Sequence, residues 1–385
     1  MVEFKFKSYA THINKIKKFE LDIKHHSVVQ KGNIGTSFIY ALQLRGQSKN
    51  IYILRGKRPK SNEEGTNFKI PMNESSPLLI LKSKAGGHSE TWEYSGITNK
   101  WFVGTKSSKG SSKWDTQIAR IDIKNSKPVY SSNAQLTRLG YLNRAGNEKD
   151  RFAGKYMHRV EIALSPDYKK FLIASVEKNG TGHFAIYPTH CINEELDKKE
   201  GEHGLINIGD LTDKLKDPDK SEIESFTVKP FLNMYKKGKD KKTKQPIDVI
   251  RYQGNIESVQ GYDLDNDGNI YITSQKSPFY DKVKKKFTTY HKQIIKIPSR
   301  SENGEKLSEE ERADMSNWFA VNLSKWKKID IAGKHSEVEG IQIIDEDHAY
   351  VTVAYHALVK GKNTTVLNVI YELNWDWVPV ESVTN

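Results

Sequence analysis

The sequence predicts an all-β protein built as a five-bladed β-propeller, and three observations support this fold class. Short runs of β-branched and aromatic residues, bounded by Gly, Asn, Asp and Lys, dominate the 385 residues. A two-residue motif recurs five times, each time before an expected strand. The first and last parts of the chain also resemble each other. We expect one propeller domain over residues 1–385, with long loops between its strands.

The expected strands are short, and long helical periodicity is nearly absent. The segment Ser308–Asn317 is the best helix candidate, because a serine cap precedes three glutamates that suit the positive end of a helix dipole. The clearest strand candidates are Phe38–Leu44, Ile51–Leu54, Ile118–Ile123, Phe171–Val176, Ile270–Ser274, Ile294–Ile297 and Tyr350–Tyr355.

The recurring motif is a β-branched or aromatic residue followed by Gln or Glu. After each of the last three copies come a short strand, a polar turn, a β-rich strand and a third strand, as expected for radially repeated blades. Two β-sandwiches with chance similarity are the alternative. The intervals between successive copies of the motif exceed the ~40–50 residues of common propeller repeats, so the blades must carry long loops. The repeats would begin near residues 28, 91, 159, 258 and 337.

Similar segments near the two ends of the chain predict how the ring closes. Residues Lys17–Gly32 and Lys327–Gly340 both run from a basic pair through an alternating strand to His-Ser. We therefore expect Phe19–Ile23, within an N-terminal segment 1–24, to pair as the outer strand of the last blade beside Val366–Leu373. Such pairing leaves no open first or last blade.

The second residue of each motif is a candidate site residue, because the first strand of each propeller blade lines the central channel. Clustered carboxyls repel one another and raise a pKa, so the ring could bind a sugar, hold a cation or act as an acid/base pair. Repetition in every blade favours the alternative, a structural role in bonding neighbouring blades. The motif residues are Gln30, Glu93, Glu161, Gln260 and Glu339, and the nearby histidines are His26, His88, His158 and His335.

The net charge of +13, with 61 Lys and Arg against 48 Asp and Glu, favours a polyanionic partner. No recognition pattern for nucleic acid is present. Two lysine clusters in loops of the fourth repeat would bind teichoic acid or anionic lipid, or would only keep the loops soluble. The clusters are Lys236, Lys237, Lys239, Lys241, Lys242 and Lys244, and Lys282, Lys284, Lys285 and Lys286.

Other motifs give little support for metal or cofactor chemistry. Asp263, Asp265 and Asp267 match the first half of an EF-hand loop, but Ser274 stands where calcium binding needs a bidentate glutamate, so a tight turn is favoured. The single cysteine, Cys191, excludes an intramolecular disulfide. Phosphate-loop, dinucleotide, zincin and serine-hydrolase motifs are absent. We assign no metal, no cofactor and no catalytic residue.

Nine segments spread over most of the chain carry a family resemblance. They are Val28–Gly35, Ala41–Arg45, Ala85–Tyr94, Gln117–Asp122, Leu142–Gly146, Val259–Lys276, His291–Pro298, Gly333–Ile344 and Val351–His356. Together they resemble the helveticin J family, the large heat-labile class III bacteriocins of lactic acid bacteria. The departures lie in the N-terminal segment and in the two lysine-rich insertions. The resemblance implies a protein that kills or inhibits related Gram-positive bacteria through the cell envelope, and it transfers no catalytic residues.

These observations lead to one preferred function and two alternatives. We expect an extracellular antibacterial protein, without a recognisable signal peptide or membrane-spanning segment, that binds a teichoic acid, surface glycan or anionic lipid and compromises the envelope. A binding protein is favoured over an enzyme. The first alternative is a propeller glycoside hydrolase or lyase that uses Glu93, Glu161 and Glu339. The second is a non-catalytic, lectin-like module that binds glycan.

Overall fold

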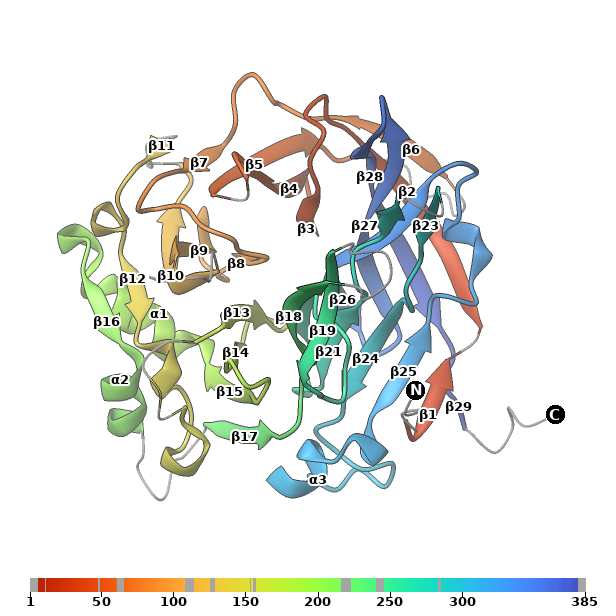
Figure 1. Cartoon of the computed structure of the whole chain (residues 1–385). Helices are drawn as coiled ribbons and strands as arrows, with labels where there is room; N and C mark the ends of the chain where they lie inside the picture. The colour runs from red at the N-terminus through yellow and green to blue at the C-terminus, as the bar shows by residue number, and fades with distance from the viewer. Residues whose placement is uncertain are drawn as a thin grey trace.

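The computed structural model shows five sheets arranged around a central axis, which confirms the predicted all-β class and five-bladed propeller (Figure 1). Within each of the first three blades the strands run outward from the axis. The structure describes residues 6–10, 12–47, 49–60, 66–107, 114–124, 129–152, 154, 157–215, 223–239, 246–282 and 285–379.

Blades one to three follow the order of the chain. Blade one contains β3 (Val29–Ile34), β4 (Phe38–Arg45), β5 (Asn50–Lys57), β7 (Leu79–Leu81) and β11 (Val129–Tyr130). Blade two contains β8 (Trp92–Tyr94), β9 (Lys100–Ser107), β10 (Asp115–Asp122), β12 (Arg138–Gly140) and β16 (Leu205–Asn207). Blade three contains β13 (Arg159–Leu164), β14 (Lys170–Val176), β15 (Gly182–Pro188) and β17 (Glu224–Val228).

Blades four and five include strands from both ends of the chain. Blade four contains β20 (Gly261–Leu264), β21 (Ile270–Ser274), β24 (Gln293–Ile297), β25 (Phe319–Asn322), β1 (Ser8–Ala10) and β29 (Val378–Pro379). Blade five contains β26 (His335–Asp345), β27 (His348–Val359), β28 (Lys362–Trp375), β2 (Ile13–Asp22) and β6 (Asn67–Pro71). The innermost strands β3, β8, β13, β20 and β26 contact their neighbours all the way round the ring.

The N-terminal strand closes the ring as predicted. Strand β2 pairs antiparallel with β28, and Phe19 lies opposite Ile370. The pairing begins earlier than expected, at Ile13, and β6 adds in parallel on the outside, so β2 is the fourth strand of the blade. The N-terminal part of the chain also adds a strand to blade four, because β1 pairs in parallel with β25.

Two hairpins and three α-helices lie between the blade strands in the residues that the structure describes. The hairpins are β18 (Met234–Lys239) with β19 (Pro246–Tyr252), and β22 (Phe279–Asp281) with β23 (Lys286–Thr288). The lysine clusters were expected in loops, but their described parts lie largely on these hairpins, where backbone pairing fixes them. The helices are α1 (Thr189–Asp197), α2 (Ile208–Leu215) and α3 (Glu309–Ala313).

The helix expected near Ser308 is present as α3. The Ser308 side chain accepts a hydrogen bond from the backbone of Glu311, whose side chain bonds back to the Ser308 backbone in a capping box. Helices α1 and α2 were not predicted, although α1 buries Thr189, Ile192 and Leu196 at helical spacing. No helix in the described part of the chain is long and apolar enough to span a bilayer.

Glycines allow the inner strands to approach closely at the axis. A Cβ atom on Gly340 would lie 2.6 Å from the carbonyl oxygen of Gln30 in blade one, and one on Gly261 would lie 2.9 Å from the Cα atom of Gly340. A Cβ atom does not pack so closely against atoms to which it is not bonded. The narrow axis therefore has room for extended polar side chains, whereas the large aromatic residues Trp92, Trp318 and Trp375 are buried between and within the blades.

We predict that Phe19→Ala lowers the free energy of unfolding by ~3–5 kcal/mol, because it leaves a cavity in the blade that closes the ring. Phe19 is buried, its ring stacks on Phe68 at 5.5 Å, and Tyr350 packs against its edge. Chemical denaturation followed by circular dichroism measures the change. The control Asp22→Ala, on the same strand but exposed, should stay within ~0.5 kcal/mol of wild type. Equal stability of the Phe19 variant and wild type would contradict closure by β2.

Candidate functional site

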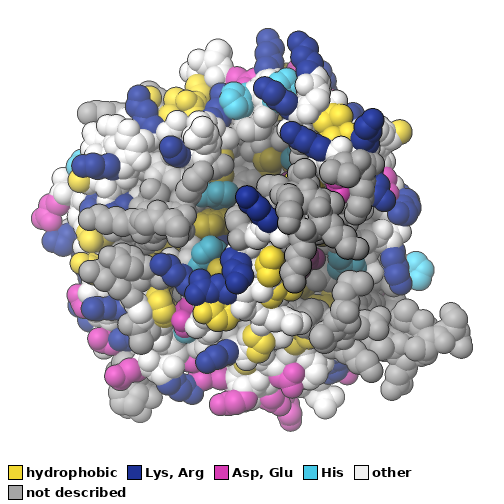
Figure 2. Space-filling view, viewed as in Figure 1, with side chains coloured by type: hydrophobic (Ala, Val, Ile, Leu, Met, Phe, Trp, Pro, Cys, Tyr) yellow, Lys and Arg dark blue, Asp and Glu magenta, His cyan; other side chains and the backbone are white. Residues whose placement is uncertain are grey.

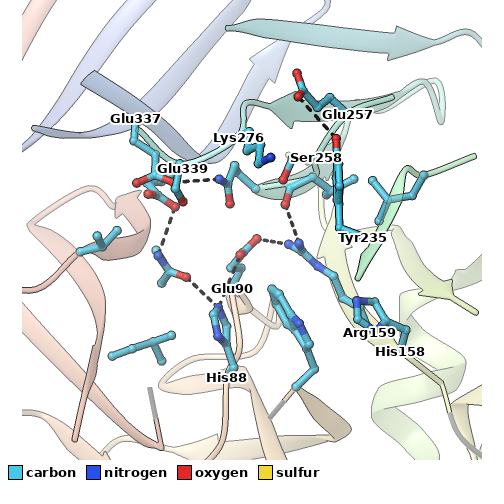
Figure 3. Close-up of a pocket in the computed structure, with 18 of the residues that line it drawn as sticks. His88, Glu90, His158, Arg159, Tyr235, Glu257, Ser258, Lys276, Glu337 and Glu339 are labelled. Atoms are coloured by element: carbon cyan, nitrogen blue, oxygen red, sulfur yellow. Dashed lines mark hydrogen bonds and ion pairs between the residues drawn. The ribbon is translucent and has the colours of Figure 1, made fainter. Parts of the chain in front are cut away.

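A cavity of about 630 Å³ lies at one end of the axis and is lined by residues near the beginnings of the inner strands. Gln30 and Glu339 belong to β3 and β26, and Arg159 begins β13. His88 and Glu90 come from the segment before β8 (Figure 3). Histidine side chains are visible near the centre of the face in Figure 2, with lysine and arginine side chains nearby. Gln260, directly before β20, adds blade four, so all five blades contribute to this end of the axis.

A chain of side-chain hydrogen bonds crosses the cavity floor from blade two to blade five. The amide nitrogen of Gln30 donates to Glu339 Oε2 at 3.1 Å, and Gln30 Oε1 lies 2.9 Å from His88 Nε2. Because Gln30 Oε1 can only accept, His88 Nε2 is the donor in this arrangement. The direction of the chain is thus fixed from His88 through Gln30 to Glu339.

Glu337 and Glu339 form a carboxyl pair at the end of this chain. Burial raises the pKa of Glu339 well above its ordinary value, and Glu337 and Glu90 raise it further by repulsion. Glu337 accepts hydrogen bonds from Gln260 Nε2 at 3.1 Å and from Ser277, and it lies 2.8 Å from His356 Nε2. Burial and repulsion therefore favour the protonated form of Glu339, and Glu337 accepts hydrogen bonds from groups of blades four and five.

Arg159 joins blades two, three and four on the other side of the cavity. Its guanidinium contacts Glu90, bonds Glu161 at 2.6 Å and donates to the carbonyl oxygen of Val259 at 2.5 Å. Trp114 lies against it, 3.9 Å from guanidinium to ring centre. Burial raises the pKa of Glu90 and of Glu161 to about 8, although the charge of Arg159 acts in the opposite direction. With the chain described above, these contacts form a polar ring that links all five blades.

Lys31 forms a second polar layer below the cavity floor. Its ammonium lies 2.6 Å from Glu93 Oε1, 2.5 Å from the carbonyl oxygen of Ile341 and 3.9 Å from Asp263 Oδ2. Burial lowers the pKa of Lys31, but the two carboxylates outweigh burial and raise it overall. Lys31 is only 1% exposed, so it is a charged group held inside the axis by partners from three other blades.

A second cavity, of about 240 Å³, lies at the opposite ends of the same inner strands. It is lined by Asn33 and Ile34 at the end of β3 and by Gln342 toward the end of β26. Glu93 lines this small cavity and not the large one, and Tyr168 lies at its edge, 43% exposed. The two cavities are thus separated along the axis by the Lys31 layer.

The structure brings together most of the predicted ring residues, but at two levels. Three motif residues and three histidines line the large cavity: Gln30, Gln260, Glu339, His26, His88 and His158. Glu161 lies behind them, bonded to Arg159. Glu93 belongs to the level of Lys31, and His335 stacks on Phe287 at 3.9 Å, away from the cavity lining. Burial and Arg159 lower the pKa of His158 to about 4, so this histidine is neutral at neutral pH.

Sequence reasoning did not identify the cavity residues Glu90, Arg159 and Glu337. A signal existed for the two glutamates, because the tripeptide His-Ser-Glu occurs at both 88–90 and 335–337. Arg159 and Lys31 stand next to motif residues but have no repeat partner of their own. Their contacts lie across blades, in segments far apart in sequence, so no local pattern reveals them.

The aspartates of the EF-hand-like segment bond to the protein itself. Asp265 accepts hydrogen bonds from the backbone of Asp267 and Asn269, in a turn where Gly268 has a φ of +87°. Asp263 accepts from the backbone nitrogen of Ile343 in blade five. In the part of the chain that the structure describes, no group of three or more His, Cys, Asp or Glu could hold a metal ion.

The predicted lysine clusters are only partly described. Lys236, Lys239, Lys282, Lys285 and Lys286 are exposed. The side chain of Lys237 lies outside the described residues, as do Lys241, Lys242, Lys244 and Lys284 as a whole.

The arrangement at the large cavity suits hydrogen bonding of a polar ligand. Its lining offers amides, hydroxyls and carboxyl groups, which are the donors and acceptors that polyols and sugars need. The faces of Trp114 are engaged, since His88 lies 3.9 Å from it on ring centres and Arg159 also packs on it. Recognition there therefore depends on hydrogen bonds more than on aromatic stacking. The carboxyls Glu93, Glu161 and Glu339 do not meet around one cavity.

Comparison with known proteins gives matches that cover nearly the whole chain. A family model described as Bacteriocin helveticin-J matches residues 9–376. Bacteriocin helveticin-J of Lactobacillus helveticus is 43% identical over 382 residues, which cover 95% of this chain and 98% of the relative. Among solved structures, the α-L-arabinofuranosidases of Coprinopsis cinerea and Podospora anserina cover 93% of this chain and 97% of their own. Their TM-scores are 0.36 and 0.37 at 7% and 8% identity, too low to bear on the site.

We predict that Glu339→Gln flattens the dependence of stability on pH. With its pKa raised in the folded state, Glu339 holds its proton to a higher pH than the unfolded chain does, so its contribution to stability is lost as pH rises above the ordinary pKa of 4.5. Glutamine mimics the protonated acid at every pH. Relative to wild type, the variant should gain unfolding free energy as pH rises from 5 to 8, by at most ~1.4 kcal/mol for each pH unit.

The control for this measurement is Glu195→Gln on α1. A hydrogen bond from Lys198 lowers the pKa of Glu195, so its effect on stability is already constant above pH 5. Urea denaturation at pH 5, 6, 7 and 8 gives both comparisons. The same pH profile for Glu339→Gln and wild type would show that Glu339 is ionised inside the axis.

Proposed function

Because the chain belongs to the helveticin J family, we propose that it is an antibacterial protein that binds the cell envelope of related Gram-positive bacteria and compromises its integrity. The observation that carries this proposal is the 43% identity to a bacteriocin over nearly the whole length of both chains. A match of that extent leaves no blade of this chain outside the shared region, since the family model alone spans residues 9–376. Such a protein acts outside the cell that makes it.

We place recognition of the envelope component at the large cavity. Its floor is used to join the blades, but Ser258 and Lys276 also line it (Figure 3). Thr365 is a further lining residue. Hydroxyl groups and an ammonium are suited to the sugar, polyol or phosphate groups of wall polymers. The net charge of +13 also favours approach to an anionic envelope.

The arrangement gives less support to a hydrolase. The carboxyls expected to do acid/base work, Glu93, Glu161 and Glu339, are divided between two levels of the axis, and Glu161 is bonded to Arg159. A pair of carboxyls that acts across a glycosidic bond must flank one ligand. Binding without cleavage is therefore the function that we propose for the cavity.

We predict that purified protein kills a related Gram-positive indicator strain, and that Ser258→Tyr reduces killing at least ~tenfold by filling the cavity mouth. A tenfold loss corresponds to about 1.4 kcal/mol of binding free energy. Colony counts after exposure measure killing, and thermal melting confirms that the variant folds. Ser75→Tyr, at an exposed position outside the cavity, is the matched control and should kill like wild type.

Three outcomes of these experiments would contradict the proposal. Absence of killing by wild-type protein contradicts the antibacterial role. Full killing by a folded Ser258→Tyr variant contradicts recognition at the cavity. Release of reducing ends or muropeptides from purified walls would show an enzyme instead of a binder.

A further inference from the structure

We infer that three hairpins on the cavity face of blades four and five form a docking surface for an anionic lipid bilayer, with their apolar side chains inserted at the lipid interface. This inference rests on the proposed function, and it names the membrane as the envelope component that this surface contacts. The hairpins are β18–β19, β22–β23 and the turn between β27 and β28. We call the described residues of these three hairpins the hairpin surface.

All three hairpins rise from the same face of the propeller. Tyr235 of β18 lines the large cavity, and so does Thr365 near the start of β28. Lys276 and Ser277, which lead into β22, line it as well. Because each hairpin has a residue in the cavity lining or leads directly from one, all three lie at the same end of the axis, on the side of blades four and five (Figure 1).

Direct contacts make the hairpin surface continuous. The ammonium of Lys276 lies 4.4 Å from the ring centre of Tyr235 and 5.1 Å from that of Tyr290, which joins the first hairpin to the second. The side chain of Asn363 donates to the carbonyl oxygen of Pro278 at 3.3 Å, which joins the second to the third. The three hairpins therefore present their outer side chains as one surface.

Exposed apolar side chains are concentrated on these hairpins. Among the described residues, six of the ten large apolar side chains that are exposed lie there, and Phe279 and Ile250 are 53% and 47% exposed. Single exposed apolar residues are ordinary, but a concentration on one face indicates an interaction surface. The six are Val249, Ile250, Tyr252, Phe279, Leu358 and Val359.

Basic residues surround the apolar ones. The side chains described at 234–239, 249–252, 279–288 and 357–362 include one acidic residue, Asp281, and it is half-buried. The exposed basic residues of the same segments are Lys236, Lys239, Arg251, Lys282, Lys285, Lys286, Lys360 and Lys362. Each cation near an anionic membrane surface adds to the attraction, so this surface is matched in charge to phosphatidylglycerol-type headgroups.

The combination of apolar and basic side chains distinguishes a bilayer from a soluble polyanion. Teichoic acid presents charge and hydroxyls but no hydrocarbon interior, so it gives Ile250, Phe279 and Leu358 nothing to enter. A bilayer interface accepts apolar side chains and keeps the cations at the headgroups. The apolar residues would be a liability for a protein that bound only an anionic polymer in water.

An environment-sensitive fluorophore at a hairpin position tests the inference directly. Cys191 is the only cysteine, so Cys191→Ser combined with Ile250→Cys allows one label at residue 250. On addition of vesicles of phosphatidylglycerol and phosphatidylcholine, the emission should shift to the blue, and vesicles of phosphatidylcholine alone should give a much smaller shift. The matched control is Cys191→Ser with Leu205→Cys, exposed on the outer strand of blade two, where no shift is expected.

A set of matched variants separates insertion from attraction by charge. The triple variant Ile250→Ser, Phe279→Ser and Leu358→Ser should reduce co-sedimentation with anionic vesicles at least ~tenfold. The control variant Val129→Ser with Leu205→Ser removes exposed apolar side chains elsewhere and should bind like wild type. Thermal melting verifies the fold of both.

The outcomes distinguish this inference from the proposed function. Three results would each overturn the inference: wild-type protein does not bind vesicles, the label at residue 250 does not shift, or the triple variant binds as well as wild type. The third result would show that the surface binds polyanions only. Killing of sensitive cells without vesicle binding would overturn the inference and leave the antibacterial function intact. Vesicle binding without killing would contradict the antibacterial function and leave the hairpin surface as a lipid-binding site.

Discussion

The structure depends on a charged group that is buried where the five blades meet. Taking the Lys31 ammonium out of water is unfavourable by several kcal/mol unless opposite charges and hydrogen bonds replace the lost solvation. Glu93, Asp263 and the carbonyl oxygen of Ile341 do so, and they come from blades two, four and five, while Lys31 belongs to blade one. If blade one, two or four moves away from the axis, the Lys31 ammonium is separated from a carboxyl that balances its charge. Lys31 therefore fixes how four sheets are placed relative to one another.

Arg159 of blade three completes this arrangement one level higher. It bonds Glu161 of its own strand, Glu90 of blade two and the backbone before blade four, in the floor of the large cavity. The inner strands approach too closely at Gly261 and Gly340 for bulky side chains, so extended polar side chains fill the axis. As a consequence, the side chains on the cavity floor hold the blades together. The other lining residues and the hairpin surface are left to bind ligands.

The sequence allowed the architecture to be predicted because the fold repeats. The motif before each inner strand and the similarity between Lys17–Gly32 and Lys327–Gly340 were enough to predict five blades and closure by β2. Strand β1 was beyond prediction, since three residues carry no pattern and its pairing with β25 depends on closure having occurred. Helix α1 was missed although its buried residues have helical spacing, because strand signals surround it.

The candidate site was predictable only where its residues repeat. Gln30, Gln260 and Glu339 were found from the motif, but Glu93 fell on another level because the inner strands are not in the same register along the axis. Lys31 and Arg159 occur once each. Their importance comes from partners tens to hundreds of residues away, which a local pattern does not contain.

A double-mutant cycle at Lys31 and Glu93 tests most directly whether buried charges hold the blades together. Lys31→Met should lower the free energy of unfolding by ~3–5 kcal/mol, because it leaves two carboxyls without their cation. Adding Glu93→Gln should recover part of the loss, with a coupling energy above ~1 kcal/mol. A Lys31→Met variant as stable as wild type, or effects of the two substitutions that simply add, would contradict the account.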